Sequence, residues 1–392
     1  MPCLAAEHRR QNRPVLELAD VFRQCGDFLP TLDGLQTRVV KAILNCRTAT
    51  LGGHIQQCDR CDHREISYNS CRNRHCPKCQ GSQQFRWLEA QQKHLLPIEY
   101  HHVVFTIPDS LHALFRSNPR RCYGMLFAAV AETLHDVARN PKNLGATVGF
   151  SCVLHTWTQT LLFHPHIHCI VTGGGLDSDR RRWVAARRGF LFPVPILSCL
   201  FRARLLRKLE LALDDGSLRC NDKYPHVQLR KAACKNWVVY SKPPFAGPQQ
   251  VLRYLGRYTH RVAIGNHRLV ALDDKGVTFR WKDRTRGDPN RQMTIEVQEF
   301  LRRFLLHILP SGLMRIRHYG LLANSTRRKH LARCRRLIGG RQKQATPEKA
   351  ELPISQSRFE ISPAEIFTQC PRCKNGHLVR IGTVNTLRIR AP

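Results

Sequence analysis

Acidic residues are scarce in this chain of 392 residues, where 29 Asp and Glu stand against 63 Lys and Arg and give a formal net charge of +34. Such an excess favours a polyanionic partner. Nucleic acid is the leading expectation and an anionic membrane surface the alternative. Long apolar runs are also missing, since no stretch approaches the roughly 20 residues that span a bilayer. We therefore expect no integral membrane protein.

The N-terminal stretch of polar residues lacks the apolar core of a signal peptide. We therefore expect a cytoplasmic protein in a reducing environment. The 17 cysteines are then expected to be metal ligands rather than disulfide partners.

The residue composition and the spacing of apolar residues change several times along the chain. Helical apolar spacing dominates the first part, Cys, His, Asn and Arg crowd together near residue 60, and β-branched runs alternate with helical patterns after residue 100. The last part is polar. We expect a helical N-terminus with a small metal-held module (1–97, the module at 46–81), an α/β part (98–265), a basic C-terminal part (266–341) and a loosely ordered tail (342–392).

Two CxxC pairs lie 14 residues apart, Cys58 with Cys61 and Cys76 with Cys79. Zinc takes four thiolate or imidazole ligands in a tetrahedron, and each CxxC turn delivers two thiolates. The spacing predicts one structural zinc held by these four cysteines.

Four nearby side chains, Cys46, His54, Cys71 and His75, form a candidate second zinc site. The alternative is that they are buried thiols and surface histidines. Cys370 and Cys373 form a lone CxxC, which is half a site that ligands elsewhere in the chain or in a second copy would have to complete.

Arg72 and Arg74 lie between the two CxxC pairs. They are candidate phosphate contacts of a basic finger, the alternative being a solvated loop.

A His-x-His pair, His166 and His168, occurs in a run that predicts a strand. Side chains alternate between the two faces of a strand, so both imidazoles point to one face and could hold a metal. His155 precedes them on a second predicted strand and is the expected third ligand, ahead of Gln159 and His164. The alternative for His155 is a hydrogen-bonded core histidine.

Tyr254 and Tyr258 are four residues apart in a predicted helix that starts near Pro248. Residues at this spacing share a helix face, so both phenols could reach one site, and a tyrosine hydroxyl can attack a phosphodiester as a nucleophile. Arg253, Arg257 and Arg261 are candidate phosphate contacts. The alternative is a buried stripe capped by tyrosines.

Taken together, these motifs resemble the two-tyrosine rolling-circle transposases of the insertion-sequence 91 family, members of the HUH (His-hydrophobe-His) endonucleases. Gly256 stands where a polar residue is expected between the tyrosines, at a cost of about 1 kcal/mol in helix propensity. The matching stretches are 58–80, 104–108 (Val-Phe-Thr-Ile-Pro), 155–157 (His-Thr-Trp), 164–168 (His-Pro-His-Ile-His), 173–175 (Gly-Gly-Gly), 254–264 (Tyr-Leu-Gly-Arg-Tyr-Thr-His-Arg-Val-Ala-Ile) and 317–322 (Arg-His-Tyr-Gly-Leu-Leu).

The resemblance implies an α+β fold, with an HUH-endonuclease-like antiparallel sheet flanked by helices and preceded by helices and a small zinc-ribbon-like module. It implies Mg²⁺ or Mn²⁺ at His166 and His168, and Tyr254 and Tyr258 as nucleophiles on single-stranded DNA. Transposon ends, target DNA and the host replication machinery are the implied partners, in a bacterial cytoplasm at the nucleoid. An HUH replication initiator or relaxase, a non-catalytic zinc-ribbon DNA-binding protein and a transposase that uses three carboxylates are the alternatives.

Overall fold

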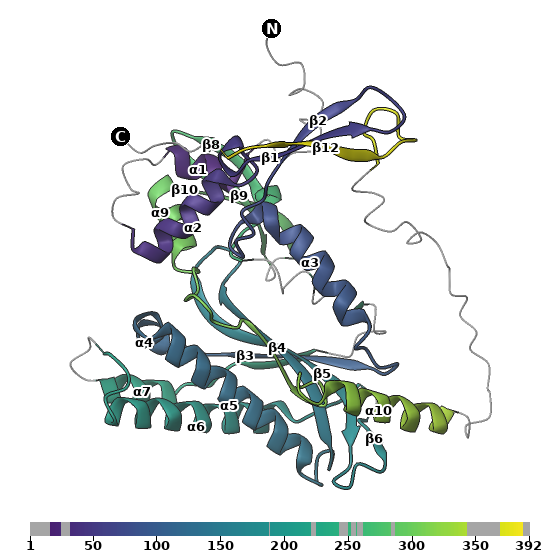
Figure 1. Cartoon of the computed structure of the whole chain (residues 1–392). Coiled ribbons are helices and arrows are strands. Elements are labelled where there is room, and N and C mark those ends of the chain that lie inside the picture. Colours follow the sequence, from purple (N-terminus) through teal and green to yellow (C-terminus); the bar gives the residue numbers. More distant parts are fainter. Residues whose placement is uncertain are drawn as a thin grey trace.

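The computed structural model describes residues 16–24, 32–187, 189–220, 225–242, 250–251, 256, 262–283, 287–342 and 369–386. A large sheet with helices beneath it forms the lower part of the molecule in Figure 1, and a second group of helices and strands lies above it. Helix α3 (Pro77–Gln92) runs between these parts. The fold is α+β with antiparallel sheets, as the sequence predicts.

The central sheet is built around two long strands that pair antiparallel along most of their lengths. The path through the sheet is β11-β4-β5-β3-β7, and β6 pairs with β5 outside this path. Its strands are β3 (Tyr100–Thr106), β4 (Thr147–Trp157), β5 (Phe163–Leu176), β6 (Trp183–Ala185), β7 (Val239–Lys242) and β11 (Ile316–Gly320).

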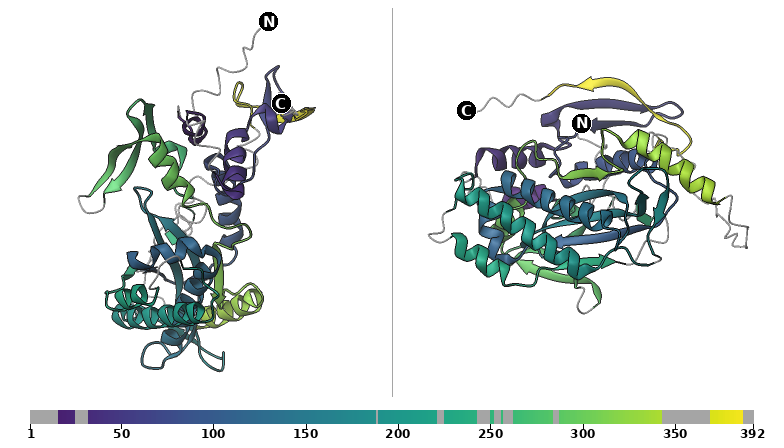
Figure 2. Two further views of the ribbon diagram at one scale, coloured as in Figure 1. Left: turned by 90° about the vertical axis from the view of Figure 1, so that its left-hand side faces the viewer. Right: turned by 90° about the horizontal axis from the view of Figure 1, so that it is seen from below.

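One face of this sheet is covered by helices, which Figure 2 shows from below. Alternate strand residues such as Phe105, Phe150 and Ile167 point to this face and are fully buried there. Helix α5 carries an apolar stripe that packs on the same residues. The covering elements are η4 (Asp109–Leu111), α4 (His112–Ser117), α5 (Pro119–Arg139), α6 (Val194–Asp214) and α7 (Pro225–Ala233).

A second core joins the N-terminal helices to a small three-stranded sheet of order β10-β9-β8. Phe22 packs edge-on against Phe304 there, with ring centroids 5.8 Å apart. Asp33 and Gln36 form a capping box that begins α2. The elements are α1 (Leu18–Gln24), α2 (Gly34–Asn45), η5 (Asn266–Arg268), β8 (Leu269–Asp273), β9 (Gly276–Asp283), β10 (Asp288–Ile295) and α9 (Val297–Leu305).

A third sheet joins segments that are far apart in the sequence, because strand β12 (Leu378–Val384) pairs with β1 (Gly53–Cys58). The hairpin partner of β1 is β2 (Arg64–Tyr68), so the order is β12-β1-β2. The yellow strand beside the purple hairpin in Figure 1 shows this pairing. The remaining elements are η3 (Ala49–Leu51) and α10 (Arg327–Gln342).

The structure differs from the sequence prediction in the C-terminal tail and adds detail to the basic stretch before it. The tail beyond residue 342 was expected to be loosely ordered, but its residues 378–384 form β12. The basic stretch 311–342 contributes both a strand of the central sheet, β11, and the helix α10. Most of the predicted helix at 249–262 lies outside the described residues. Within the described ranges, no helix combines the length and apolarity that a membrane crossing requires.

Candidate functional site: a histidine face and two cysteine clusters

Three histidines meet on the face of the central sheet that the helices α4–α7 leave uncovered. His155 on β4 lies directly opposite His166 on β5, and His168 follows two residues later on the same face. One ring nitrogen from each lies within 4.8 Å of the others. The two Nε2 atoms of His166 and His168 are 3.1 Å apart. The structure therefore brings together the three side chains that the sequence predicts as metal ligands.

One hydrogen bond beside these rings fixes the tautomer of His166. The Nδ1–H of His166 donates to the carbonyl oxygen of His164 at 2.7 Å, because that oxygen can only accept. The neutral His166 ring therefore presents an Nε2 lone pair toward His168. His164, which ranked below His155 as a ligand, acts here through its backbone.

A fourth histidine, which the sequence analysis did not select, supports this face. His102 lies on β3, and its Nε2 is 2.9 Å from Nδ1 of His168. The two rings are nearly parallel, at 10° and with centroids 5.1 Å apart. In the tautomer that presents an Nε2 lone pair to a metal, Nδ1–H of His168 donates to His102. The sequence does place His102 at the start of a predicted strand. It does not show the register of that strand against β5, which brings His102 beside His168.

The described rings fit a metal centre by their donor set and spacing. His155 is 3% exposed and His168 is 8% exposed, while Trp157 stacks on His155 with centroids 4.4 Å apart. Neighbouring ligands of an octahedral ion with bonds of about 2.1 Å lie about 3 Å apart, close to the separation of the His166 and His168 Nε2 atoms. Burial on one side and a fixed tautomer are what orient imidazole ligands.

Tyr254, Tyr258, Arg253, Arg257 and Arg261 lie outside the described residues. Two residues beside them are described. Val251 is fully buried in a cluster with Tyr100 and Ile170, which lie on the histidine-bearing face. Gly256 approaches α3 so closely that an added Cβ would lie 2.8 Å from Leu88 and 2.9 Å from Gln84.

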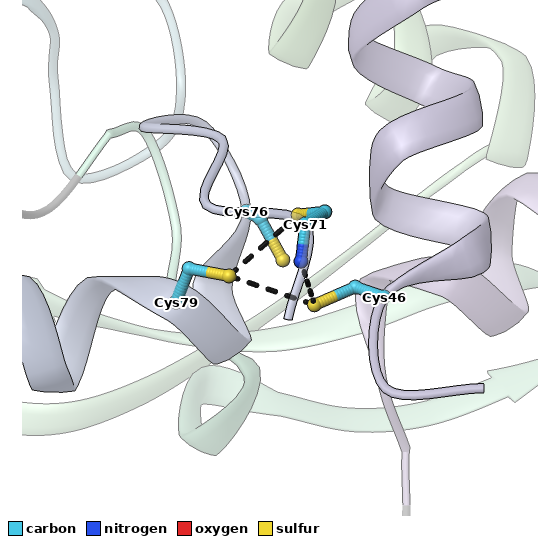
Figure 3. Close-up of side chains that lie close together, drawn as sticks. All are labelled: Cys46, Cys71, Cys76 and Cys79. Atoms are coloured by element: carbon cyan, nitrogen blue, oxygen red, sulfur yellow. Dashed lines mark hydrogen bonds between the residues drawn. The ribbon is translucent and has the colours of Figure 1, made fainter. Parts of the chain in front are cut away.

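The eight cysteines of the CxxC pairs and their neighbours form two clusters, which differ from the predicted grouping. Cys46, Cys71, Cys76 and Cys79 form the first, and their sulfurs point toward one another in Figure 3. Cys58 and Cys61 do not join Cys76 and Cys79; they lie with Cys370 and Cys373. The predicted single site of Cys58, Cys61, Cys76 and Cys79 is thus corrected by the topology.

The first cluster is built where α2 ends and α3 begins. Cys46 is the C-cap of α2, and Cys76 is the N-cap of α3, followed by Pro77 at the first helical position. The sulfur of Cys79 is 3.5 Å from that of Cys46 and 3.6 Å from that of Cys71. Contact with the Cys71 and Cys76 thiols lowers the pKa of Cys46 to about 7, which favours the thiolate that metals bind.

The two histidines expected at a second zinc site are used differently. His75 is buried, its Nδ1 contacts the Asn73 Oδ1 at 3.0 Å, and its Nε2 accepts from the backbone N–H of Leu309 at 3.2 Å. Burial lowers the pKa of His75 to about 3. Both ring nitrogens are therefore engaged within the protein. His54 lies on β1 and belongs to neither cysteine cluster.

The two arginines of the expected phosphate finger differ in exposure. Arg72 is exposed, in a left-handed backbone conformation at φ 53°. Arg74 donates from Nη1 and Nη2 to the carbonyl oxygens of Leu313 and Pro310 at 2.7 and 3.0 Å. The Arg74 guanidinium therefore links the loop before Cys76 to residues 310–313, which precede β11.

Comparison with known proteins agrees with this architecture. A family model described as "Transposase zinc-binding domain" matches residues 19–107, and one described as "Putative transposase" matches residues 149–330. The "Putative transposase y4qJ" of Sinorhizobium fredii is 47% identical over 381 residues, with 93% of this chain and 94% of the relative covered. The "Transposase for insertion sequence element IS801" of Pseudomonas savastanoi pv. phaseolicola is 27% identical over 348 residues. The match covers 85% of this chain and 81% of the relative.

These matches define a transposase with an N-terminal zinc-binding domain. The chain belongs to the insertion-sequence 91 family of transposases. No solved structure matches it. A transposase of this kind acts on DNA at the ends of its element, and the zinc-binding domain with its cysteine clusters indicates structural zinc.

Proposed function

We propose that this transposase cuts and joins single-stranded DNA at the ends of its element through 5′-phosphotyrosine intermediates, with Tyr254 and Tyr258 as nucleophiles. The observation that carries the proposal is the meeting of His155, His166 and His168 on one sheet face. A divalent ion held there would polarise the scissile phosphate and stabilise its developing charge. We expect Mg²⁺ or Mn²⁺ as this ion, because both stabilise negative charge on a transferring phosphate.

The chain's own groups would then carry the reaction. The tyrosine oxygen attacks phosphorus, the P–O3′ bond breaks, and the 3′ oxygen leaves as a hydroxyl. The tyrosine proton is lost to solvent and the leaving oxygen gains one, so no oxidant and no energy-rich cofactor is consumed. A 3′-OH from another strand reverses the step and joins the ends. The released 3′-OH is also suited to prime replication by the host machinery.

Two described residues near the tyrosines support the proposal. Val251 shares a buried cluster with Ile170, which is two positions from His168 on β5. Gly256, between the two tyrosines, contacts α3. The chain on either side of Tyr254 therefore borders the histidine-bearing face and the helix above it.

Basic side chains supply the affinity for DNA. Exposed residues of α10, among them Arg328, Lys329 and Arg336, present positive charge with no acidic residue on the helix. Contacts of this kind bind the phosphate backbone with little sequence preference and weaken steeply with salt. Arg253, Arg257 and Arg261 would hold the scissile phosphate beside the tyrosines.

A covalent-adduct assay tests the proposal. Single-stranded DNA from a transposon end, labelled at its 3′ end, is incubated with the full-length protein and Mn²⁺. We expect a labelled protein band that disappears in Tyr254→Phe/Tyr258→Phe and in His166→Ala/His168→Ala. Tyr240→Phe is the matched control, because Tyr240 is exposed on β7. An adduct that persists in the double tyrosine variant would refute the assignment.

A further inference from the structure

Cysteines from opposite ends of the chain form the second cluster. The sulfur of Cys58 is 3.7 Å from that of Cys373, and the sulfur of Cys61 is 3.7 Å from that of Cys370. The members of these two pairs are 315 and 309 residues apart in sequence. Cys370 and Cys373 lie outside both matched family regions, 19–107 and 149–330.

The spacing of these sulfurs is that of a metal tetrahedron. With Zn–S bonds of about 2.3 Å, the edge of a tetrahedron of sulfurs is about 3.8 Å. A disulfide would need about 2.05 Å. All four Sγ atoms lie within 4.8 Å of one another.

Each CxxC turn also has the backbone geometry that supports thiolates. The N–H of Arg60 donates to the sulfur of Cys58, and the N–H of Gly376 donates to the sulfur of Cys373, each at 3.3 Å. Such bonds stabilise negative charge on sulfur. Each turn therefore directs one backbone N–H at a cysteine sulfur of the same four-cysteine cluster.

The two turns are also bonded directly to each other. Asp59 accepts from the N–H of His377 at 2.7 Å through Oδ1, and its own N–H donates to the His377 carbonyl oxygen at 3.0 Å. Gly376 packs so tightly here that an added Cβ would lie 2.5 Å from the sulfur of Cys58. The C-terminal turn is therefore shaped to fit the N-terminal one.

We propose that Cys58, Cys61, Cys370 and Cys373 bind a second structural zinc ion, which fastens the C-terminal segment 369–384 to the N-terminal zinc-binding domain. The ion lies at the end of the β1–β12 pair, where Cys58 is opposite Leu378. It closes the chain into a loop of more than 300 residues and holds β12 on the edge of β1. If β12 were released, β1 would present an unpaired edge.

Zinc counting on the full-length protein tests this site independently of DNA cleavage. We expect two zinc ions per chain in the wild type and one in Cys370→Ser/Cys373→Ser, with the same loss in Cys58→Ser/Cys61→Ser. Cys199→Ser/Cys234→Ser should keep two, because both thiols are exposed and belong to neither cluster. One zinc in the wild type, or two in the Cys370/Cys373 variant, would overturn the proposal.

A variant that keeps every ligand separates metal binding from folding. Gly376→Ala should release one of the two zinc ions to a chelator at least tenfold faster than the wild type. Gly382→Ala is its control on the same segment, since an added Cβ would meet Ile55 at an ordinary 3.6 Å. Equal release rates in the two glycine variants would count against the proposed packing of the site.

Mixing experiments decide whether the site forms within one chain. Cys58→Ser/Cys61→Ser and Cys370→Ser/Cys373→Ser proteins, unfolded and refolded together with zinc, should still hold one zinc per chain. Recovery of additional zinc in the mixture would mean that the two turns come from different copies, contrary to the proposal.

Discussion

The Nε2 of His102 lies 2.9 Å from the Nδ1 of His168. The orientation of one proposed metal ligand, His168, therefore depends on a side chain from the neighbouring strand. His102 is itself buried. A ring held in this way presents its other nitrogen in a fixed direction, and outer partners of metal-bound histidines commonly affect affinity 10- to 100-fold.

The first prediction follows from this contact. His102→Phe keeps a ring against His168 but loses the acceptor, so the Mn²⁺ concentration for half-maximal adduct formation should rise by about tenfold or more. His102→Gln supplies an amide oxygen and should recover part of the loss. The measurement is a Mn²⁺ titration of adduct yield. Identical titrations for Phe and wild type would show that the contact does not orient the ligand.

Gly256 provides a second prediction, because its packing opposes its helix propensity. Gly256→Ala should raise helix propensity by about 1 kcal/mol, yet its Cβ would meet Leu88 on α3 at 2.8 Å. We expect slower adduct formation with unchanged Mn²⁺ dependence. Leu88→Ala should restore the rate in the double variant. Additive losses in a double-mutant cycle would mean that the two residues act separately.

The two cysteine clusters should differ in their effect on stability. Cys46, Cys76 and Cys79 belong to the core that includes Phe22 and Phe304. Cys58 and Cys370 instead lie in a small cluster with Leu378, Cys61 and Cys373. Cys46→Ser should therefore lower the melting temperature much more than Cys370→Ser. Differential scanning calorimetry of the two variants measures this. Equal shifts would contradict the assignment of the first cluster to the core.

His307 predicts a loss of stability in mild acid. It is fully buried, its Nδ1 contacts the Thr156 hydroxyl at 3.1 Å, and its Nε2–H donates to the Leu161 carbonyl at 2.9 Å. Burial lowers its pKa from 6.5 to about 4. The unfolded state binds more protons between these values, so stability is present above the unfolded pKa and falls as pH drops below it.

Lowering the pH from 7.5 to 5.5 should cost roughly 1 kcal/mol through His307 alone. His307→Gln removes the titration and should show a smaller decline in unfolding free energy over this range. Urea unfolding at the two pH values measures the difference. The same decline in both proteins would exclude His307 as its source.

The sequence predicted those parts of the site that depend on local periodicity. The alternation along β5 placed His166 and His168 on one face, and hairpin pairing placed His155 opposite them. It did not predict His102, because strand register between β3 and β5 is set by tertiary packing. Cys46 and Cys71 were candidates for a second site with His54 and His75, but the structure groups them with Cys76 and Cys79. Nothing local to the sequence shows that the Leu309 N–H bonds to the Nε2 of His75.

The predicted grouping of the cysteines was wrong because it depends on the topology of the fold. Spacing identifies each CxxC turn but does not say which turn faces which, and here each turn closes against a different partner. Cys76 and Cys79 meet cysteines at the end of α2 and in the preceding loop, whereas Cys58 meets a segment more than 300 residues away. The short strands β1, β2 and β12 carry weak periodicity and exist through their mutual pairing.

Mass spectrometry of the protein–DNA adduct tests the central claim most directly. Trypsin should cleave after Arg253, Arg257 and Arg261, so residues 254–257 and 258–261 become separate peptides with one tyrosine each. The account predicts that the 5′-phosphate of the cut strand is attached to one of these two peptides, only with a divalent metal and only with His166 and His168 intact. Attachment to any other residue, or metal-independent attachment, would contradict it.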